Sequence, residues 1–164
     1  MVELLNKKGI KTAVTGHDKF KNDVNEADAK VVIEVRVPAQ VDDAAGKTEA
    51  STVLEKEDTV AIYGSNEFAA KAIINANGGF KESKLGADKI LAVGFDSGAL
   101  QQDAIRKGIF VGSVTQDPVQ IGYQAVKLAV AAAKGETVKD VDTGSKWYDA
   151  KNIDSDEIKA LLYE

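Results

Sequence analysis

The residues of this chain that could do chemistry are mostly amides, carboxylates and hydroxyls, and they follow short runs of β-branched residues. Four of them are our candidate binding residues, namely Ser65, Asn66, Asp96 and Gln116. The hydroxyls of a sugar both donate and accept hydrogen bonds, so they match a mixture of amides, carboxylates and hydroxyls, and few cations stand among these residues. The set therefore favours a neutral polyol over a phosphate-bearing ligand.

Catalytic alternatives have weaker support in the sequence. The chain has no Cys and a single His, His17, which excludes thiolate nucleophiles, zinc ribbons and His-rich metal cages. His17 and Asp18 are neighbours in a turn and rarely point together, while no G-x-S-x-G motif and no glycine-rich phosphate motif occurs. We therefore expect no catalytic residue, no metal and no cofactor. A phospho-acceptor role for Asp96 stays open beside simple helix capping.

The composition indicates a soluble α/β domain rather than a nucleic-acid binder. The chain has 21 Lys and Arg against 26 Asp and Glu, a net charge of −5, which offers no basic surface to a phosphate backbone or an anionic membrane. No apolar run reaches the roughly 18–20 residues that span a bilayer, and residues 1–9 lack the apolar core of a secretory signal. We expect one domain over residues 1–164 that binds no nucleic acid.

The elements that must position the candidate residues alternate between strand and helix. Continuous β-branched runs predict five strands, at Lys11–Thr15, Lys30–Val37, Thr59–Tyr63, Lys89–Val93 and Ile109–Val114. Because these runs do not alternate with polar residues, they predict strands covered on both faces, as in parallel sheets. The fold class that we predict is α/β, an open parallel sheet of about five strands with helices on both faces.

Segments with helical spacing of apolar residues separate these runs, including the link between the first two. The N-caps that we predict are Asn66, Ser97 and Asp117, and the stops are Gly78, Gly108 and Gly135. The segment Asp42–Glu57 predicts a weaker helix that is interrupted by Gly46. An irregular tail follows, in which we expect Trp147 and Tyr148 to anchor the chain to the core rather than to stack on a sugar. A short helix from Asp154 ends the chain.

Open α/β sheets bind ligands beyond the carboxyl ends of their strands. Asn66, Asp96 and Gln116 each follow a strand directly. We therefore expect the three side chains to line one rim of the sheet.

Four turn segments are more specific together than any one is alone: Tyr63–Phe68 (YGSNEF), Val93–Ser97 (VGFDS), Gly112–Tyr123 (GSVTQDPVQIGY) and Asp142–Asp149 (DTGSKWYD). In this order they resemble successive motifs of the sugar-binding proteins of the type I periplasmic class, which includes ribose-binding protein and the effector domains of the lac repressor family. The stretch Ala29–Glu164 resembles the C-terminal half of such proteins.

The resemblance implies a function and a site. It implies a non-catalytic solute-binding lobe for carbohydrate ABC import or sugar sensing, with a monosaccharide as ligand and a membrane permease as partner. It implies that Ser65 or Asn66 contacts sugar hydroxyls, that Asp96 accepts from paired hydroxyls and that Gln116 lies beside the hinge. The implied location is periplasmic or at the cell surface, and a cytoplasmic location stays open because residues 1–9 carry no secretory signal.

The chain departs from the family's pattern in its length. Members have two lobes that close around the ligand by hinge motion, and most of the N-terminal lobe has no counterpart here. The resemblance assigns Val111–Gly135 largely to that other lobe, so its apolar stripe needs a cover. We expect a homodimer or the missing lobe to supply it, and sugar binding by the isolated chain to be weak or lost. The alternative function is a stand-alone lobe that acts as a dimerising interaction module without a ligand.

Overall fold

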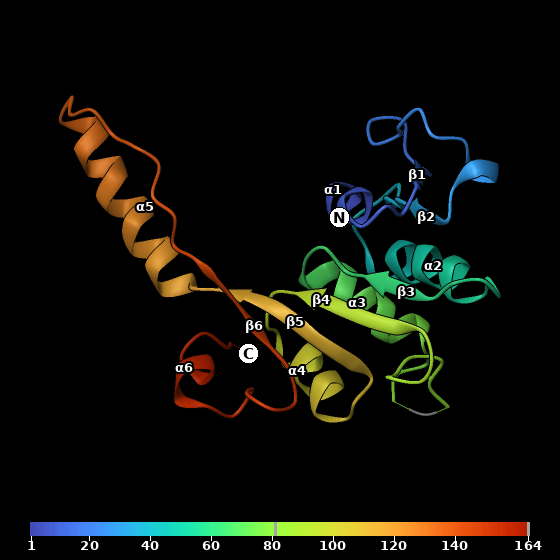
Figure 1. Cartoon of the computed structure of the whole chain (residues 1–164). Coiled ribbons are helices and arrows are strands. Elements are labelled where there is room, and N and C mark those ends of the chain that lie inside the picture. Colours follow the sequence, from blue (N-terminus) through green and yellow to red (C-terminus); the bar gives the residue numbers. More distant parts are fainter. Residues whose placement is uncertain (81, 164) are drawn as a thin grey trace. The chain divides into compact units, whose positions relative to one another are not determined.

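The computed structural model describes residues 1–80 and 82–163. The chain divides into two compact units, Met1–Val41 and Asp42–Glu164, whose helices and strands are labelled in Figure 1. None of the described helices has the length and apolarity that crossing a membrane requires.

The first unit is built on a pair of parallel strands. Its elements are α1 (Val2–Lys7), β1 (Thr12–Thr15), the short 3-10 helix η1 (Glu26–Asp28) and β2 (Val31–Glu34). Asn22, between β1 and η1, accepts from the Val14 N–H at 3.0 Å and donates to the Thr12 carbonyl at 3.0 Å. The link between the strands is therefore tied to the edge of β1, and the helix that we expected between these strands is reduced to η1.

The second unit contains the larger sheet. Its elements in chain order are α2 (Asp43–Leu54), β3 (Ala61–Tyr63), α3 (Glu67–Ala76), β4 (Leu91–Phe95), α4 (Ala99–Arg106), β5 (Phe110–Gln116), α5 (Pro118–Ala133), β6 (Ser145–Tyr148) and α6 (Asp156–Lys159). Within its described residues, the sheet has the strand order β3-β4-β5-β6. Strands β3, β4 and β5 are parallel, and β6 is antiparallel to β5.

All five predicted runs overlap a strand, although β4 and β5 extend two residues beyond theirs, and the parallel α/β class is confirmed. The prediction that they form one sheet is wrong, because β1 and β2 pair only with each other among the described residues. Local patterns report how a strand is buried and not which strand lies beside it. Consecutive strands are neighbours in roughly two thirds of cases, and β2 and β3 are an exception.

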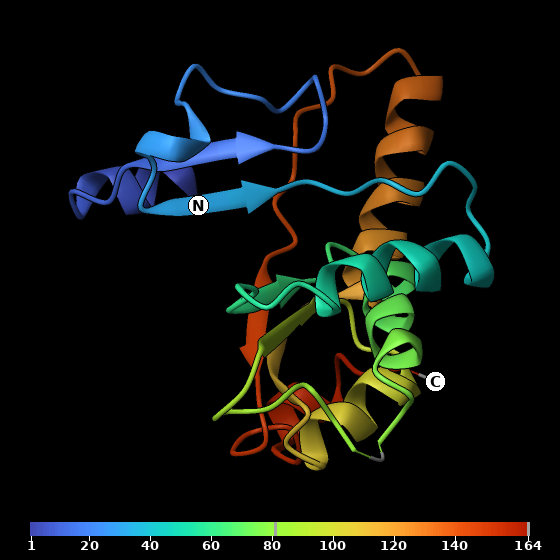
Figure 2. The same cartoon turned by 90° about the vertical axis from the view of Figure 1, so that its right-hand side faces the viewer.

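The helices α3 and α4 lie on the same face of the larger sheet, as Figure 2 shows. Each links two neighbouring parallel strands, and both connections step in the same direction across the sheet. Right-handed connections that step the same way place their helices on the same face. On the opposite face, Tyr63, Leu91 and Trp147 are between 40 and 49% exposed. Among the described helices of this unit, α3 and α4 thus cover the same face, where we predicted helices on both, because the strand order does not reverse between β3 and β5.

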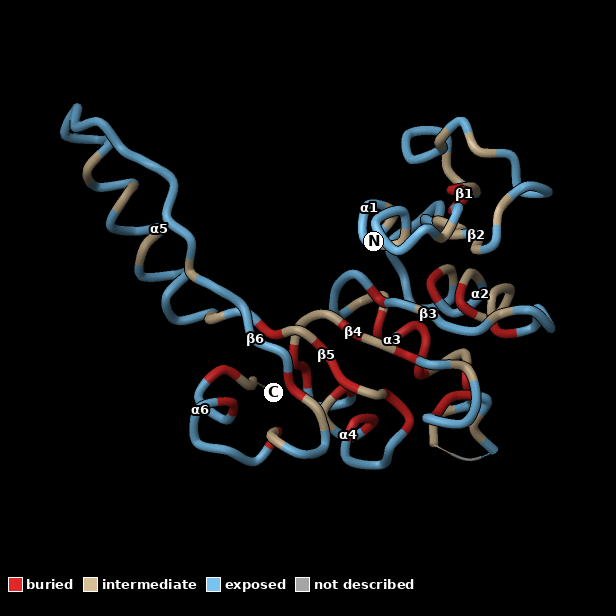
Figure 3. Tube along the Cα trace, viewed as in Figure 1, coloured by how far each residue is buried: buried red, intermediate tan, exposed pale blue. Residues whose placement is uncertain are grey.

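The core lies between this sheet and its helices. Its buried members include Ile73 and Ile74 from α3, Ile105 from α4, Phe110 from β5 and Tyr148 from β6. Figure 3 shows the buried residues gathered on these elements, whereas every residue of α5 is exposed or only partly buried.

Helix α2 continues through Gly46, where we predicted an interruption. Gly46 is buried, and a Cβ at this position would lie 2.9 Å from Phe68 Cζ and 3.1 Å from Ala72 Cβ. Close packing of α2 on α3 therefore requires the glycine. This packing compensates for the cost of about 1 kcal/mol that glycine imposes on a helix.

The predicted helix ends are confirmed with one exception. Asn66 and Asp117 cap α3 and α5, and Gly78, Gly108 and Gly135 follow α3, α4 and α5 with positive φ. The prediction that Ser97 caps α4 is wrong, because the cap residue is Gly98 and Ser97 is fully buried.

The tail that we predicted to be irregular contains the edge strand β6. It pairs with β5 from Ser113 opposite Tyr148 to Gln116 opposite Ser145. The segment is too short to show an alternating pattern in the sequence. It becomes a strand because its backbone pairs with the open edge of β5.

Candidate functional site

The carboxyl ends of β3, β4 and β5 meet at one edge of the larger sheet. The register that places Tyr63 opposite Val93 and Phe95 opposite Val114 brings the ends of these strands side by side. Parallel strands share this edge, which is where open α/β sheets bind ligands.

The four predicted residues lie at this edge. Ser65 and Asn66 form the turn between β3 and α3, Asp96 follows β4, and Gln116 is the last residue of β5. Asp96 is partly buried and the other three are exposed. The structure thus places the four residues at the predicted rim, and their contact with a ligand stays a prediction.

Asn66 and Asp96 meet at the first turn of α3. Asn66 Oδ1 accepts from the Ala69 N–H at 2.9 Å, and Asp96 Oδ2 accepts from the Glu67 N–H at 2.9 Å. These side chains satisfy N–H groups that a helix N-terminus leaves unpaired, and the helix dipole favours the charge of Asp96. Within the described residues, no hydrogen bond engages Asn66 Nδ2 or Asp96 Oδ1. These two atoms are therefore available to a ligand hydroxyl.

Asp96 adopts a left-handed backbone with φ 74°, which strains a residue other than glycine. Its N–H donates to the Val114 carbonyl at 2.7 Å. Its carbonyl accepts from Tyr148 Oη at 2.8 Å, Ser113 Oγ at 2.9 Å and Gln101 Nε2 at 3.1 Å. A strained conformation persists only where its surroundings over-determine it, and such residues cluster at functional sites. These bonds hold the Asp96 carboxylate at the rim.

Sequence reasoning missed the donors that hold Asp96, because they lie on other elements. Tyr148 is fully buried, and burial raises its pKa to about 12, so the hydroxyl stays protonated and donates. The anchor role predicted for Tyr148 is confirmed, whereas Trp147 is 44% exposed. For Gln101 and Ser113 the sequence offers no comparable pattern.

A small pocket lies next to the rim. It has a volume of about 30 Å³ and is lined by Glu67, Lys71, Gly98, Leu100 and Gln101. Gln101 Oε1 is buried without a partner in the described structure. A cavity of this size holds about one water molecule, which could donate to an acceptor such as this one. It is too small for a monosaccharide.

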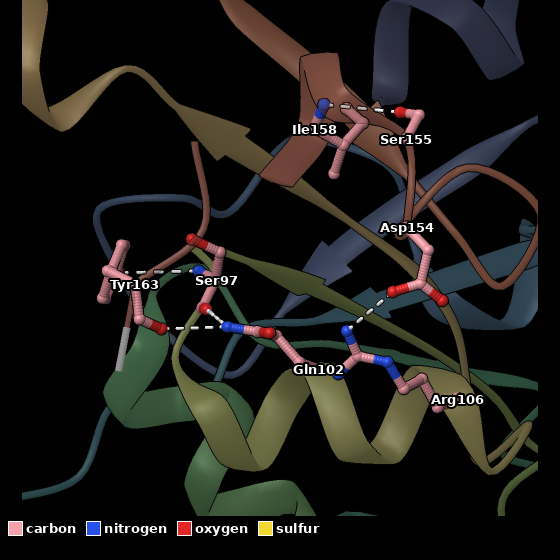
Figure 4. A network of polar contacts seen from close by, with 7 residues as sticks. All are labelled: Ser97, Gln102, Arg106, Asp154, Ser155, Ile158 and Tyr163. Carbon is pink, nitrogen blue, oxygen red and sulfur yellow. Dashed lines mark hydrogen bonds and ion pairs between the residues drawn. The ribbon is translucent and has the colours of Figure 1, made fainter. Parts of the chain in front are cut away.

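The C-terminal tail is fastened to the turn that follows β4, as Figure 4 shows. Ser97 Oγ donates to the Leu161 carbonyl at 3.3 Å. Gln102 Nε2 donates to the Ser97 carbonyl at 2.7 Å and to the Tyr163 carbonyl at 2.9 Å. The hydroxyl that we expected to cap α4 is thus engaged by the tail.

Two of the alternatives, a His17–Asp18 pair and a metal-assisted phospho-acceptor at Asp96, lack their required geometry in the described residues. Asp18 pairs with Lys21, with Oδ1 and Nζ 2.6 Å apart, and this bond lowers the pKa of Asp18. His17 instead accepts from the Lys19 N–H at 3.3 Å. The described part of the chain contains no cluster of three or more His, Cys, Asp or Glu side chains that could hold a metal ion, including the acidic cluster that a phospho-acceptor Asp96 would need.

A family model for the periplasmic binding protein domain matches residues 4–137, most of the chain. The chain belongs to the periplasmic binding protein family. This finding confirms the resemblance that the four turn segments carry. No curated protein matches the chain.

Solved structures of this family share the fold of the periplasmic binding protein described here. An ABC transporter, LacI family transcriptional regulator from Brachyspira murdochii is 36% identical, with a TM-score of 0.72, and the match covers 100% of this chain and 61% of that one. An ABC transporter solute-binding protein from Agrobacterium vitis with bound D-fucose is 26% identical, with a TM-score of 0.71 and coverage of 98% and 59%. A carbohydrate transporter solute-binding protein from Agrobacterium radiobacter, in complex with D-arabinose, is 20% identical, with a TM-score of 0.64 and coverage of 99% and 59%. At that identity it shows the fold alone.

This periplasmic binding protein chain spans about three fifths of the length of these solved structures.

Proposed function

We propose that the chain binds a monosaccharide, without catalysis, as part of a solute-binding protein that serves an ABC-type membrane permease in the periplasm or at the cell surface. The observation that carries this proposal is the meeting of Asn66 and Asp96 at the N-terminus of α3, joined by the bond from the Glu67 N–H to Asp96 Oδ2. An amide beside a carboxylate can donate to and accept from adjacent sugar hydroxyls. The D-fucose bound by the Agrobacterium vitis protein supports this ligand class.

We further propose that this rim is half of a site, and that residues 111–135 belong with the other half. The rim is open, and every residue of α5 is at least partly exposed. A sugar held against one open face leaves many of its hydroxyls in water and gains little from desolvation. The isolated chain should therefore bind monosaccharides weakly.

Titration with D-fucose and D-arabinose tests the binding role. We expect a dissociation constant on the order of millimolar or weaker, with amide resonances of residues 65–67 and 96–97 shifting in two-dimensional ¹⁵N NMR spectra. Asp96→Asn should weaken binding about 10-fold or more, because a hydrogen bond to a charged group is among the stronger ones.

The matched control is Asp103→Asn, which neutralises an exposed carboxylate on α4 that pairs with Lys107. This variant should bind as the parent chain does. Shifts that avoid the rim, or an absence of shifts at high sugar concentration, would refute the sugar-binding role of this chain. Tight saturable binding by a monomer would instead refute the proposal that the site is half complete.

The surface of α5 supports a second candidate function, that of an interaction module. Val119, Tyr123 and Val126 are 60 to 70% exposed, and Lys127 is the one charged residue within the helix. A helix that is apolar around most of its circumference is normally buried. We infer that a second copy of this chain covers α5 when no other lobe is present.

Light scattering over a dilution series measures this association. The chain should have the mass of a dimer at high concentration and should dissociate on dilution, and Val126→Lys should shift the midpoint to at least about 10-fold higher concentration, because it places a charge in an apolar contact. Val60→Lys, at a still more exposed position before β3, should leave the midpoint unchanged. A monomer at every concentration would show that α5 is not an interface between copies.

A further inference from the structure

Tyr163 connects the two turns that carry Asn66 and Asp96. Its hydroxyl donates to Glu67 Oε2 at 3.2 Å and accepts from the Ser97 N–H at 3.5 Å. We propose that Tyr163 is a positioning residue of the rim, which fixes the placement of these two turns relative to each other. The consequence for ligand affinity rests on the proposed function, and the link between the turns does not.

The Glu67 carboxylate spans from the first turn of α3 to the first turn of α4. A Cβ at Gly98 would lie 2.3 Å from Glu67 Oε1, so the carboxylate occupies the space that Gly98 leaves open. There it lies near the positive end of α4, which favours its charge. The Glu67 side chain thus connects the two turns, and the hydroxyl of Tyr163 donates a hydrogen bond to its carboxylate.

Burial raises the pKa of Tyr163, and the negative charges of Asp96 and Glu67 act in the same direction, against the bond from Ser97, which lowers it. The hydroxyl is therefore protonated at neutral pH and donates its hydrogen to the Glu67 carboxylate. A hydrogen bond with a charged acceptor is stronger than one between neutral groups.

The tail is held in place without this hydroxyl. Leu161 is buried, and its carbonyl accepts from Ser97 Oγ at 3.3 Å and from Thr115 Oγ1 at 3.4 Å. Gln102 Nε2 donates a hydrogen bond to the Tyr163 carbonyl at 2.9 Å. Removing only the hydroxyl therefore tests the link between the turns and leaves the anchoring of the tail intact.

This link matters most when a ligand is bound. The other bond between the same turns joins the Glu67 N–H to Asp96 Oδ2, and a sugar hydroxyl that donates to Asp96 draws on the same carboxylate. The bond through Tyr163 uses no atom of Asp96. It can therefore hold the spacing of Asn66 and Asp96 while Asp96 contacts a ligand.

The experiment compares Tyr163→Phe with the parent chain and with Thr48→Val, which removes an exposed hydroxyl from α2. In Tyr163→Phe, we expect the amide resonances of Asn66, Glu67 and Ser97 to shift together, and the Ser97 amide to exchange with solvent about 3- to 10-fold faster, as loss of one hydrogen bond implies. The melting temperature should fall by less than about 5 °C. Thr48→Val should change none of these quantities.

Three results would overturn the proposal. Shifts at Ser97 with Asn66 and Glu67 unmoved would show that Tyr163 anchors the tail alone, and a large drop in melting temperature with shifts throughout the sheet would show a general structural role. Where D-fucose binds the parent chain, Tyr163→Phe should weaken it about 3- to 10-fold, and an unchanged affinity also overturns the proposal. If the parent chain binds no sugar, the proposed function fails while the amide measurements still decide the role of Tyr163.

Discussion

Tyr148→Ala is expected to lower the free energy of unfolding by about 3–5 kcal/mol, the largest stability effect of any single substitution considered in this chain. Tyr148 is 0% exposed and joins the core that α3, α4 and the tail share. Truncation leaves a cavity and removes the hydroxyl that donates to the Asp96 carbonyl at 2.8 Å. Urea denaturation followed by circular dichroism measures the change.

Two companion variants separate the contributions to this effect. Tyr148→Phe removes the hydroxyl alone and should cost about 1 kcal/mol. Val60→Ala, at a position that is 76% exposed, should cost less than about 1 kcal/mol. If Tyr148→Ala were no more destabilising than Val60→Ala, then β6 would not belong to the sheet and the support of Asp96 would be wrong.

Gly112→Ala is expected to lower the free energy of unfolding by about 1–3 kcal/mol. A Cβ on this buried strand residue would lie 2.2 Å from Trp147 Cζ2 and 2.7 Å from the Tyr148 carbonyl oxygen. The Trp147 ring can move, because it is 44% exposed, but the carbonyl moves only if β6 shifts from β5. Thermal and urea unfolding of the full chain test this.

Gly122→Ala is the matched control. Nothing lies within 4 Å of a Cβ at Gly122, which is inside α5, so alanine should stabilise the helix by up to about 1 kcal/mol. The double variant Gly112→Ala/Trp147→Ala separates the two contacts. Removing the Trp147 ring should restore only the part of the stability that is lost to the contact with that ring, and the part lost to the contact with the Tyr148 carbonyl should remain. Equal stability of Gly112→Ala and the parent chain would contradict the close approach of β6 to β5.

The candidate site shows how well the positions of residues along the chain predict which of them lie at one edge of the sheet. Asn66, Asp96 and Gln116 were placed at one edge because each follows a predicted strand, and in parallel strands this relation holds whatever the neighbouring helices do. Caps are equally local, so Asn66 and Asp117 were predicted correctly. Ser97 failed as a cap because its hydroxyl bonds Leu161, a residue 64 positions away in the chain. No local pattern reports such a contact.

What the sequence determined by itself is the positions of β1 to β5 and of the helices α2 to α5, the parallel α/β class, the family and the order of polar turns along one edge. These follow from periodicity, capping and turn chemistry, which act over a few residues. The tertiary structure alone decided that β1 and β2 form a separate sheet, that α3 and α4 share a face, and that β6 closes the edge of β5. It also decided the strained φ of Asp96 and the bond from Tyr163 to Glu67. Each of these features depends on groups that are far apart in the sequence and come into contact only after the chain has folded.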